Sequence, residues 1–428
     1  MSIKKIIKKL MPSSLWGWLH RSRCRFFIEM HQHHYNSIIK RLRNKKEPLN
    51  VLFMVIYSSN WKYDSVYQLM LNDPKFNPLI LICPDVFRGR EHMLDAMNQC
   101  CQTFDLKGYA YVKTYDELTD SYLDAHIYSP DIIFYTNPYN IINDSRYFID
   151  NFQSSLPCYI NYAFGNHNHE WGFNLMFHQQ LWRYYVECKS NLSLIASSSY
   201  IKGRNCIVTG YPMYDAFQTG TSDGYEWKNN NRKFKRIIWS PHHTINTEDE
   251  IRYSTFLLYY DVMWNLSQKY KDQIQFVFKP HPLLKDALYK TDNWGREKTD
   301  KYFSKWSTGE NTAYVEGEYI DLFNSSDAMI NDSGSFTLEY LYMCKPCLLL
   351  NNYNRQMDAN EVSLRAIDCW YLATEAKHIE EFIRNVVLED KDSKKEKREA
   401  FFKDELLPPN GVSVAENIIN DIKNSIWK

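Results

Sequence analysis

The segment Lys279-Pro280-His281-Pro282 places a cation and an imidazole directly after a strongly apolar run, residues 274–278. A proline on each side restricts the backbone and is expected to hold the His281 side chain at the rim of a sheet. Lys279 lies two residues earlier and therefore falls on the same face of the predicted strand. Phosphoryl transfer depends mainly on positioning and on neutralising a leaving phosphate, and these two side chains suit that task.

A second candidate phosphate site is the turn Asp332-Ser333-Gly334-Ser335, between a short apolar run (328–330) and a predicted helix (336–343). Backbone N–H groups at the start of a helix form an anion site. The hydroxyls of Ser333 and Ser335 add donors, and Gly334 lets a ligand approach the backbone. The alternative interpretation is an ordinary strand–helix junction capped by serine.

A loop at 162–171, YAFGNHNHEW, follows another predicted strand and holds His167 and His169. Histidine is the natural general base near neutral pH, so either residue is a candidate to deprotonate a substrate hydroxyl. The His-x-His spacing leaves two alternatives open, a partial metal site and a structural hydrogen-bonding loop.

Apolar runs alternating with helical patterns must position these residues. Strands are predicted at 49–56, 78–83, 109–112, 132–135, 158–161, 236–239, 274–278 and 328–330, with helices between them such as 64–71, 91–103, 145–152 and 250–270. This alternation predicts an α/β protein with parallel, doubly wound sheets, whose ligands bind at the carboxyl ends of strands. A polar segment, 220–235, separates two halves. We expect one Rossmann-like domain over 49–209, a second over 210–409, a C-terminal helix over 410–428 and a site in the cleft between the halves.

The first 48 residues differ from the rest because they carry twelve Lys and Arg against two Glu. Apolar residues at Ile3, Ile6, Ile7 and Leu10 follow helical spacing, with lysines on the other face. Basic charge, tryptophans and an amphipathic pattern predict a helix on the inner, anionic surface of the membrane. A solvated helix that packs on the main body is the alternative.

Composition excludes several classes of function. The chain is 44% hydrophobic and 24% charged with a formal net charge of zero, which argues against a nucleic-acid binder. Scattered cysteines and the lack of a secretory signal favour a cytoplasmic protein, and no apolar run is long enough to span a bilayer. Cys344 and Cys347 form a lone C-x-x-C pair, so we expect structural cysteines, no metal and no cofactor.

An ordered set of motifs resembles the CDP-glycerol glycerophosphotransferase family, whose enzymes polymerise teichoic-acid-like poly(polyol phosphate). The set spans about residues 210–350 and consists of Gly210-x-Pro212-x-x-Asp215, Ser240-Pro241, Lys279-Pro280-His281-Pro282, Ser326-Asp327, Asp332-Ser333-Gly334-Ser335 and Lys345-Pro346. Asn410-Gly411, before the last predicted helix, also resembles the C-terminal end of sequences in that family.

The resemblance implies a GT-B fold in which the first domain handles the acceptor and the second binds a CDP-activated donor. His281 would contact the donor pyrophosphate and help to expel CMP. Ser333, Ser335 and the Gly334 backbone would cradle the phosphates, with Lys279 and Asp332 beside them. Glu339, one helical turn later, would hydrogen-bond a ribose or polyol hydroxyl, or else is a solvent-facing acid.

Two departures from the family pattern concern histidines. The family has a His-Gly motif for its base where this chain has Gly165-Asn166-His167. The family often has Pro-Thr-x-Arg where this chain has Pro241-His242-His243-Thr244, so an arginine is missing. We expect His242 or His243 to take its role on phosphate.

These features predict a transferase that moves glycerol phosphate, or a related polyol phosphate, from a CDP-polyol to a lipid-linked or glycan acceptor at the membrane. Two alternatives are a GT-B glycosyltransferase of capsule synthesis that uses a nucleotide sugar, and an inactive scaffold that tethers a capsule assembly to the membrane.

Overall fold

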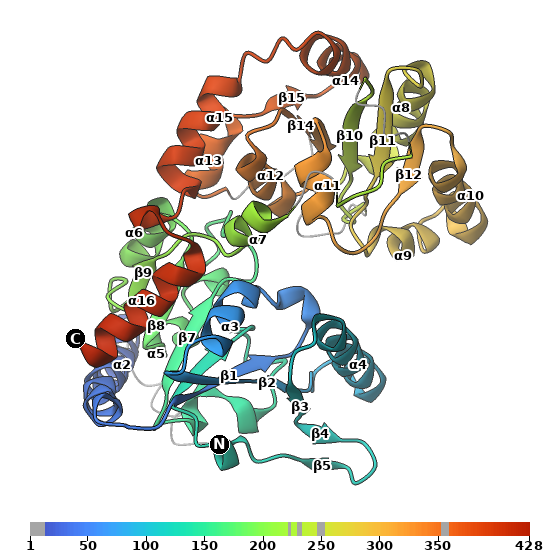
Figure 1. The fold of residues 1–428 in the computed structure, drawn as a ribbon. Coiled ribbons are helices and arrows are strands. Elements are labelled where there is room, and N and C mark those ends of the chain that lie inside the picture. The colour runs from blue at the N-terminus through green and yellow to red at the C-terminus, as the bar shows by residue number, and fades with distance from the viewer. Residues whose placement is uncertain (1–12, 221–223, 229–232, 246–252, 352–358) are drawn as a thin grey trace. The chain divides into compact units, whose positions relative to one another are not determined.

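The computed structural model describes residues 13–220, 224–228, 233–245, 253–351 and 359–428 (Figure 1). The chain forms two compact units. Unit 1 comprises residues 1–165, 169–212 and 408–428, and unit 2 comprises residues 166–168 and 213–407. The predicted C-terminal helix therefore returns to the first unit, and three residues of the predicted histidine loop belong to the second.

Unit 1 is built on a parallel sheet of seven strands in the order β3-β2-β1-β6-β7-β8-β9. The central strands are buried on both faces, which is why they read as continuous apolar runs in the sequence. The strands are β1 (Leu49–Val55), β2 (Phe76–Ile82), β3 (Tyr111–Lys113), β6 (Ile132–Tyr135), β7 (Leu156–Ile160), β8 (Arg183–Val186) and β9 (Cys206–Val208).

The helices of unit 1 follow the predicted pattern with one difference. They are α2 (Ser13–Arg43), α3 (Asp64–Leu71), α4 (Arg90–Lys107), α5 (Met176–Gln180), α6 (Lys189–Ser198) and α16 (Val414–Trp427). Strands β4 (Tyr115–Asp116) and β5 (Ser121–Tyr122) form a small antiparallel hairpin. The expected helix at 145–152 is instead two short 3₁₀ turns, Ser145–Tyr147 and Ile149–Asn151. The Asp144 side chain caps the first turn by accepting from the Arg146 N–H, and that local bond competes with a regular helix.

Helices α2 and α16 both pack on unit 1 (Figure 1). A capping box between Ser413 and Glu416 starts α16, whose apolar side is buried. On α2, Tyr35 and Leu42 are buried, and Arg43 donates to the Ile426 carbonyl of α16 (2.8 Å). The described part of the basic segment is therefore attached to the main body. The apolar spacing predicted over residues 3–10 lies outside the described residues.

Unit 2 holds a parallel sheet of six strands in the order β12-β11-β10-β13-β14-β15. The strands are β10 (Lys235–Ser240), β11 (Ile274–Phe278), β12 (Thr312–Tyr314), β13 (Ala328–Asn331), β14 (Cys347–Leu350) and β15 (Tyr371–Ala373). The helices are α7 (Met213–Thr219), α8 (Phe256–Lys269), α9 (Leu284–Tyr289), α10 (Gly295–Thr308), α11 (Ile320–Ser325), α12 (Ser335–Tyr340), α13 (Glu361–Ile367), α14 (Ala376–Glu381) and α15 (Lys395–Phe401).

Both sheets reverse their strand order at one point, between β1 and β6 in unit 1 and between β10 and β13 in unit 2. In open parallel sheets, ligands bind outside the carboxyl ends of the strands at such a switch point. In unit 2 the two loops there begin at Pro241 and Asp332, which are the loops that the sequence singles out.

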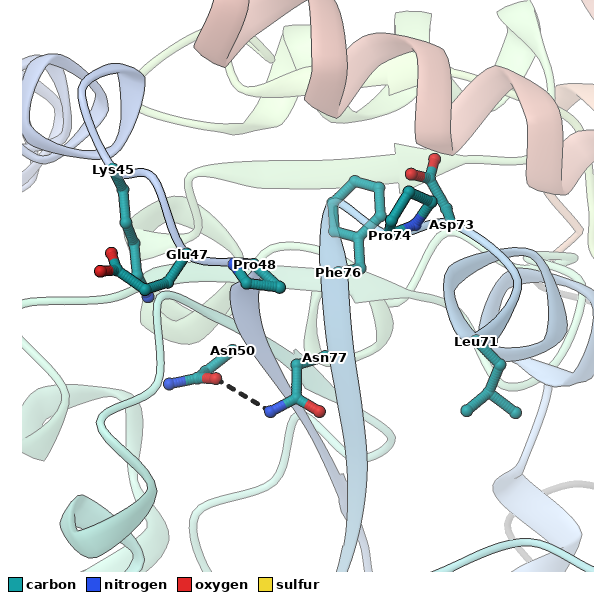
Figure 2. A pocket seen from close by; sticks show the side chains of 9 residues that line it. All are labelled: Lys45, Glu47, Pro48, Asn50, Leu71, Asp73, Pro74, Phe76 and Asn77. Carbon is teal, nitrogen blue, oxygen red and sulfur yellow. Dashed lines mark hydrogen bonds between the residues drawn. The ribbon is translucent and has the colours of Figure 1, made fainter.

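A cavity of about 590 Å³ lies at the opposite edge of unit 1, by the amino ends of β1 and β2 (Figure 2). Asn77 donates to Asn50 across its floor (3.1 Å), and Lys45, Pro48 and Phe76 are among its other lining residues. Its position does not match either switch point, so the cavity is not a candidate for the predicted chemistry.

None of the helices among the described residues has the length and apolar character that crossing a membrane requires.

The buried imidazole of His178 makes the stability of unit 1 depend on pH. Burial lowers the pKa of His178 to about 3, and its Nδ1 accepts the Leu175 N–H (3.1 Å). Between pH 6.5 and 3 the unfolded chain binds a proton that the folded chain does not, so stability falls as the pH falls through this window. We expect the wild type to lose about 2 kcal/mol more than His178→Gln between pH 7.5 and pH 5.0, because each pH unit below 6.5 costs about 1.4 kcal/mol. Urea unfolding of both proteins at the two pH values measures this difference, and equal losses would contradict it.

Candidate active site

The loops after β10 and β11 are joined by backbone contacts at the carboxyl edge of unit 2. Lys279 donates its N–H to the Trp239 carbonyl (2.8 Å), and the Ser240 hydroxyl donates to the Lys279 carbonyl (2.6 Å). His281 donates its N–H to the Pro241 carbonyl (2.9 Å). The Lys279-Pro280-His281-Pro282 segment therefore lies beside the Pro241-His242-His243 segment, as neighbouring parallel strands require.

This arrangement brings three histidine rings together. The ring centres of His243 and His281 are 4.1 Å apart, those of His242 and His243 are 4.3 Å apart, and those of His242 and His281 are 5.0 Å apart. All three residues are half-buried. The expectation that His242 or His243 acts on phosphate in place of an arginine stays a prediction.

The nitrogens of these rings decide what the cluster can bind. One nitrogen from each ring lies within 4.8 Å of the others, close enough to consider a divalent cation. However, the Leu283 N–H points at Nδ1 of His281 (3.2 Å), and the Thr244 N–H points at Nδ1 of His242 (3.3 Å). A nitrogen that accepts a hydrogen bond carries the lone pair, so the proton of the neutral ring sits on Nε2 in both His281 and His242. This tautomer suits hydrogen-bond donation to phosphate oxygens better than coordination of a metal through Nε2.

His281 is a neutral imidazole at pH 7 rather than a cation. Burial, and then the neighbouring His243, lower the pKa of His281 to about 4. Lys279 is also buried, and burial lowers its pKa to about 8, so the ammonium remains mostly charged at pH 7. Its Nζ donates to the Gly317 carbonyl (2.7 Å). The segment therefore offers one cation, Lys279, and one neutral imidazole, His281.

Asp332 ties the histidine loop to the predicted phosphate turn. Its carboxylate is fully buried and accepts a hydrogen bond from the backbone N–H of His242 (2.6 Å). The same carboxylate accepts both the N–H and the hydroxyl of Thr255, next to the start of α8. These contacts give Asp332 a structural task, and the predicted contact of its side chain with a donor stays a prediction.

The turn itself is held by Asn331 at the end of β13. Its Oδ1 accepts the Ser333 N–H (3.2 Å) and the Thr337 hydroxyl (2.9 Å). Ser335 begins α12, which is only six residues long, so local N–H groups and hydroxyls matter more here than a helix dipole. The contacts of Ser333 and Ser335 with phosphate remain predictions.

Gly334 is required for space rather than for backbone conformation. Its φ of −77° and ψ of −56° are accessible to any residue. A Cβ atom at this position would lie 2.8 Å from Nδ2 of Asn166 and 3.5 Å from the Tyr253 ring. The close approach predicted for a ligand is made here by the side chain of Asn166.

Glu339 is buried on α12 and accepts the Tyr319 hydroxyl (2.5 Å). The interpretation as a solvent-facing acid is therefore wrong, because packing against Tyr319 encloses the carboxylate. Its predicted role on a ribose or polyol hydroxyl stays a prediction.

The two predicted base histidines fall in different units. His167 lies in the segment 166–168 of unit 2, where it forms a backbone bridge with Ala359. Ser363 donates its hydroxyl to the Asn166 carbonyl (2.8 Å), which attaches this segment to α13. His169 belongs to unit 1, where its ring stacks on Trp171 at 5.7 Å. Asn166 lies against Gly334 of the phosphate turn. His167 is the next residue in the sequence after Asn166, whereas His169 is three residues away.

A further cluster at the carboxyl edge of unit 1 escaped sequence reasoning. The buried carboxylate of Asp85, after β2, accepts the Tyr57 hydroxyl and the Phe87 N–H (2.8 Å). Nε2 of His92, in the first turn of α4, lies 3.6 Å from Oδ2 of Asp85. An aspartate just beyond an apolar strand was the available signal, but nothing in the spacing of Asp85 and His92 shows that they meet.

Two Rossmann-like units, each with a parallel sheet and a switch point, define the GT-B class. Three solved structures illustrate the shared fold. The wall teichoic acid polymerase TagF matches with a TM-score of 0.58 at 13% identity, over 100% of each chain. The UDP-GlcNAc 2-epimerase of Neisseria meningitidis bound to UDP-GlcNAc matches with a TM-score of 0.56 at 16% identity, over 87% of this chain and 98% of that one, and MnaA of S. aureus with UDP matches with a TM-score of 0.55 at 13% identity, over 89% and 98%. No curated protein sequence matches the chain. The family model of CDP-glycerol:poly(glycerophosphate) glycerophosphotransferase matches residues 165–424, and the chain belongs to this family.

Substitution of Gly334 tests the packing of the phosphate turn. We expect Gly334→Ala to lower CMP release from CDP-glycerol by about 10- to 100-fold, because the new methyl group displaces either the turn or segment 166–168. The backbone angles tolerate alanine, so the melting temperature should change little. The double variant Gly334→Ala/Asn166→Ala removes the clashing amide and should recover part of the rate. A single variant as active as wild type would contradict this account.

Proposed function

We propose that this enzyme transfers glycerol phosphate, or a related polyol phosphate, from a CDP-activated donor to a lipid-linked or glycan acceptor of a cell-surface polymer. Membership of the glycerophosphotransferase family supports the reaction. The observation that carries the assignment to unit 2 is the meeting of three loops, after β10, β11 and β13, at the switch point of its sheet.

The chemistry follows from the groups at this edge. The acceptor oxygen forms a bond to the β-phosphorus of the donor, and the bond from that phosphorus to the bridging oxygen breaks. CMP leaves with the electron pair, and the proton of the acceptor hydroxyl passes to a base. His281 and His242 donate from Nε2 to pyrophosphate oxygens, Lys279 supplies positive charge, and the Ser333–Ser335 turn adds further donors.

For the base, the sequence names His167 and His169. Asn166 lies against Gly334, and His167 follows Asn166 in the sequence, whereas the His169 ring is stacked on Trp171. Of these two residues, only His167 belongs to the unit that holds the phosphate turn, and substitution of each one tests its role.

A glycosyltransferase that uses a nucleotide sugar is the second candidate. Ribose recognition by Glu339 would support this candidate. That support is weak, because the Tyr319 hydroxyl already donates a hydrogen bond to one oxygen of the Glu339 carboxylate. A thermal-shift comparison of CDP-glycerol, CDP-ribitol and CMP- or UDP-sugars separates the two, since the true donor raises the melting temperature at the lowest concentration.

We further propose that the enzyme works at the inner face of the membrane and attaches there through α2. This helix exposes the apolar residues Phe26 (72%) and Met30 (51%), and the cationic residues Arg25 and, further along, Lys40 are exposed on it as well. Apolar side chains among basic ones are typical of helices that lie on an anionic lipid surface.

Loss of His281 tests the proposed transfer. We expect His281→Ala to lower CMP release from CDP-glycerol with acceptor by about 10²- to 10³-fold, because a positioned donor to the leaving group is lost. His378→Ala is the matched control, since this histidine of α14 lies outside the loops of the site and should leave the rate unchanged. Coupled detection of CMP measures both variants. Release of a nucleotide from a sugar donor, with none from any CDP-polyol, would contradict the proposal.

The exposed face of α2 can be tested without removing the helix. Deleting residues 1–46 would also remove the buried residues Tyr35 and Leu42, so Phe26→Ser/Met30→Ser is the better variant. We expect it to co-sediment less with vesicles containing anionic phospholipid, while CMP release with a water-soluble acceptor is unchanged. Leu106→Ser/Leu118→Ser alters two other exposed leucines of unit 1 and serves as the control. Equal binding of all three proteins would exclude α2 as the attachment.

A further inference from the structure

The carboxyl edge of unit 1 carries an aspartate–histidine pair with a defined orientation. Nε2 of His92 is buried and faces the Asp85 carboxylate at 3.6 Å, while 39% of the His92 side chain is exposed. The exposed surface of the ring is therefore on its other atoms. At 3.6 Å the two groups are in ion-pair contact without a hydrogen bond, and the carboxylate favours the tautomer that has its proton on Nε2 and its lone pair on Nδ1.

Several elements hold Asp85 in place. The Tyr57 hydroxyl, from the loop after β1, donates to the carboxylate, and so does the Phe87 N–H (2.8 Å). Asp85 also forms a backbone bridge with Asn143, and the Val86 N–H donates to the Ile142 carbonyl (3.0 Å), so the loop after β6 joins the cluster. The loops after β1, β2 and β6 thus meet at the switch point of this sheet, where ligands of open α/β sheets bind.

The surface around the pair suits an acceptor that carries both phosphate and apolar groups. Arg88 is exposed, and its guanidinium lies over the Tyr57 ring at 5.6 Å. Exposed apolar side chains lie on the loop after β2, at Val86 (44%) and Phe87 (60%), and on the loop after β6, at Ile141 (63%). A guanidinium binds phosphate oxygens, and the apolar side chains offer a surface to a lipid or to the carbon skeleton of a polyol.

We propose that the carboxyl edge of unit 1 binds the acceptor and that His92, oriented by Asp85, is the base that removes the proton from its hydroxyl. The inference rests on the proposed function. The proton moves from the acceptor oxygen to Nδ1 of His92, while that oxygen bonds to the β-phosphorus and CMP leaves with the electron pair. Asp85 then faces the imidazolium and stabilises its charge, as a carboxylate does in a catalytic triad.

The charged and titratable groups placed against His92 are Asp85 and Tyr57, and Arg88 lies 3.8 Å from the Asp85 carboxylate. Burial, and then the hydrogen bond to Asp85, raise the pKa of Tyr57, so its hydroxyl stays neutral and donates to the carboxylate. A general base must be unprotonated to act, so a rate that depends on one falls on the acid side.

The experiment compares pH profiles of CMP release for the wild type, His92→Gln and Asp85→Asn with CDP-glycerol and a polyol-phosphate acceptor. We expect His92→Gln to lower kcat by about 10²- to 10⁴-fold and to abolish the acid-side decline, with donor affinity by thermal shift unchanged. Asp85→Asn should lower kcat less and keep an acid-side decline, because the histidine remains. His167→Gln and His169→Gln should both retain this decline.

The matched control is His126→Gln. His126 also pairs with an aspartate, Asp124, at 2.7 Å, but it lies before β6, at the opposite edge of the sheet. This variant should keep the wild-type rate. An active wild type together with a His92→Gln variant within threefold of it would overturn the inference, as would loss of the decline in His167→Gln or His169→Gln instead. A wild type that releases no CMP from any CDP-polyol would overturn the proposed function itself.

Discussion

The loops at the carboxyl edge of unit 2 depend for their arrangement on one group, the buried carboxylate of Asp332. It receives the His242 N–H from the loop after β10 and the N–H and hydroxyl of Thr255 near the start of α8, while it stands at the end of β13. A fully buried carboxylate is tolerated only when its oxygens are bonded, so the sites of these donors are fixed. Hydrogen bonds to a charged group are worth roughly 1.5–3 kcal/mol each, and here they join the histidine loop to the phosphate turn.

The order of the strands explains why all candidate chemistry lies at two sheet edges. In each unit the chain runs outward on one side of the first strand and then returns to continue on the other side. The loops after the two central strands cannot cover each other at this point, because their helices pack on opposite faces. In unit 2 this opening is occupied by His242 and the Ser333–Ser335 turn, and in unit 1 by Tyr57 and Asp85.

The sequence predicts the elements better than the contacts between them. Continuous apolar runs identify β1 and β11 because strands buried on both faces need such residues. The assignment of 166–168 to unit 2, and of α16 to unit 1, depends instead on long-range contacts such as Ser363 with Asn166. The sequence left Glu339 open between a ribose or polyol ligand and a solvent-facing acid, because helical spacing says nothing of the Tyr319 hydroxyl that buries it. Asp85 and His92 were missed for the same reason, since their loop and helix meet only in the folded chain.

Burial sets the electrostatics of the carboxyl edge of unit 2. Burial, and then the neighbouring His243, keep His281 neutral at pH 7, since its pKa is about 4. Lys279, with a pKa of about 8, carries a positive charge at the same edge. In the proposed reaction, oriented N–H donors therefore act beside this one cation in stabilising the leaving CMP. Such donors act through direction and distance, which is why Asp332 and Asn331 fix the loops that carry them.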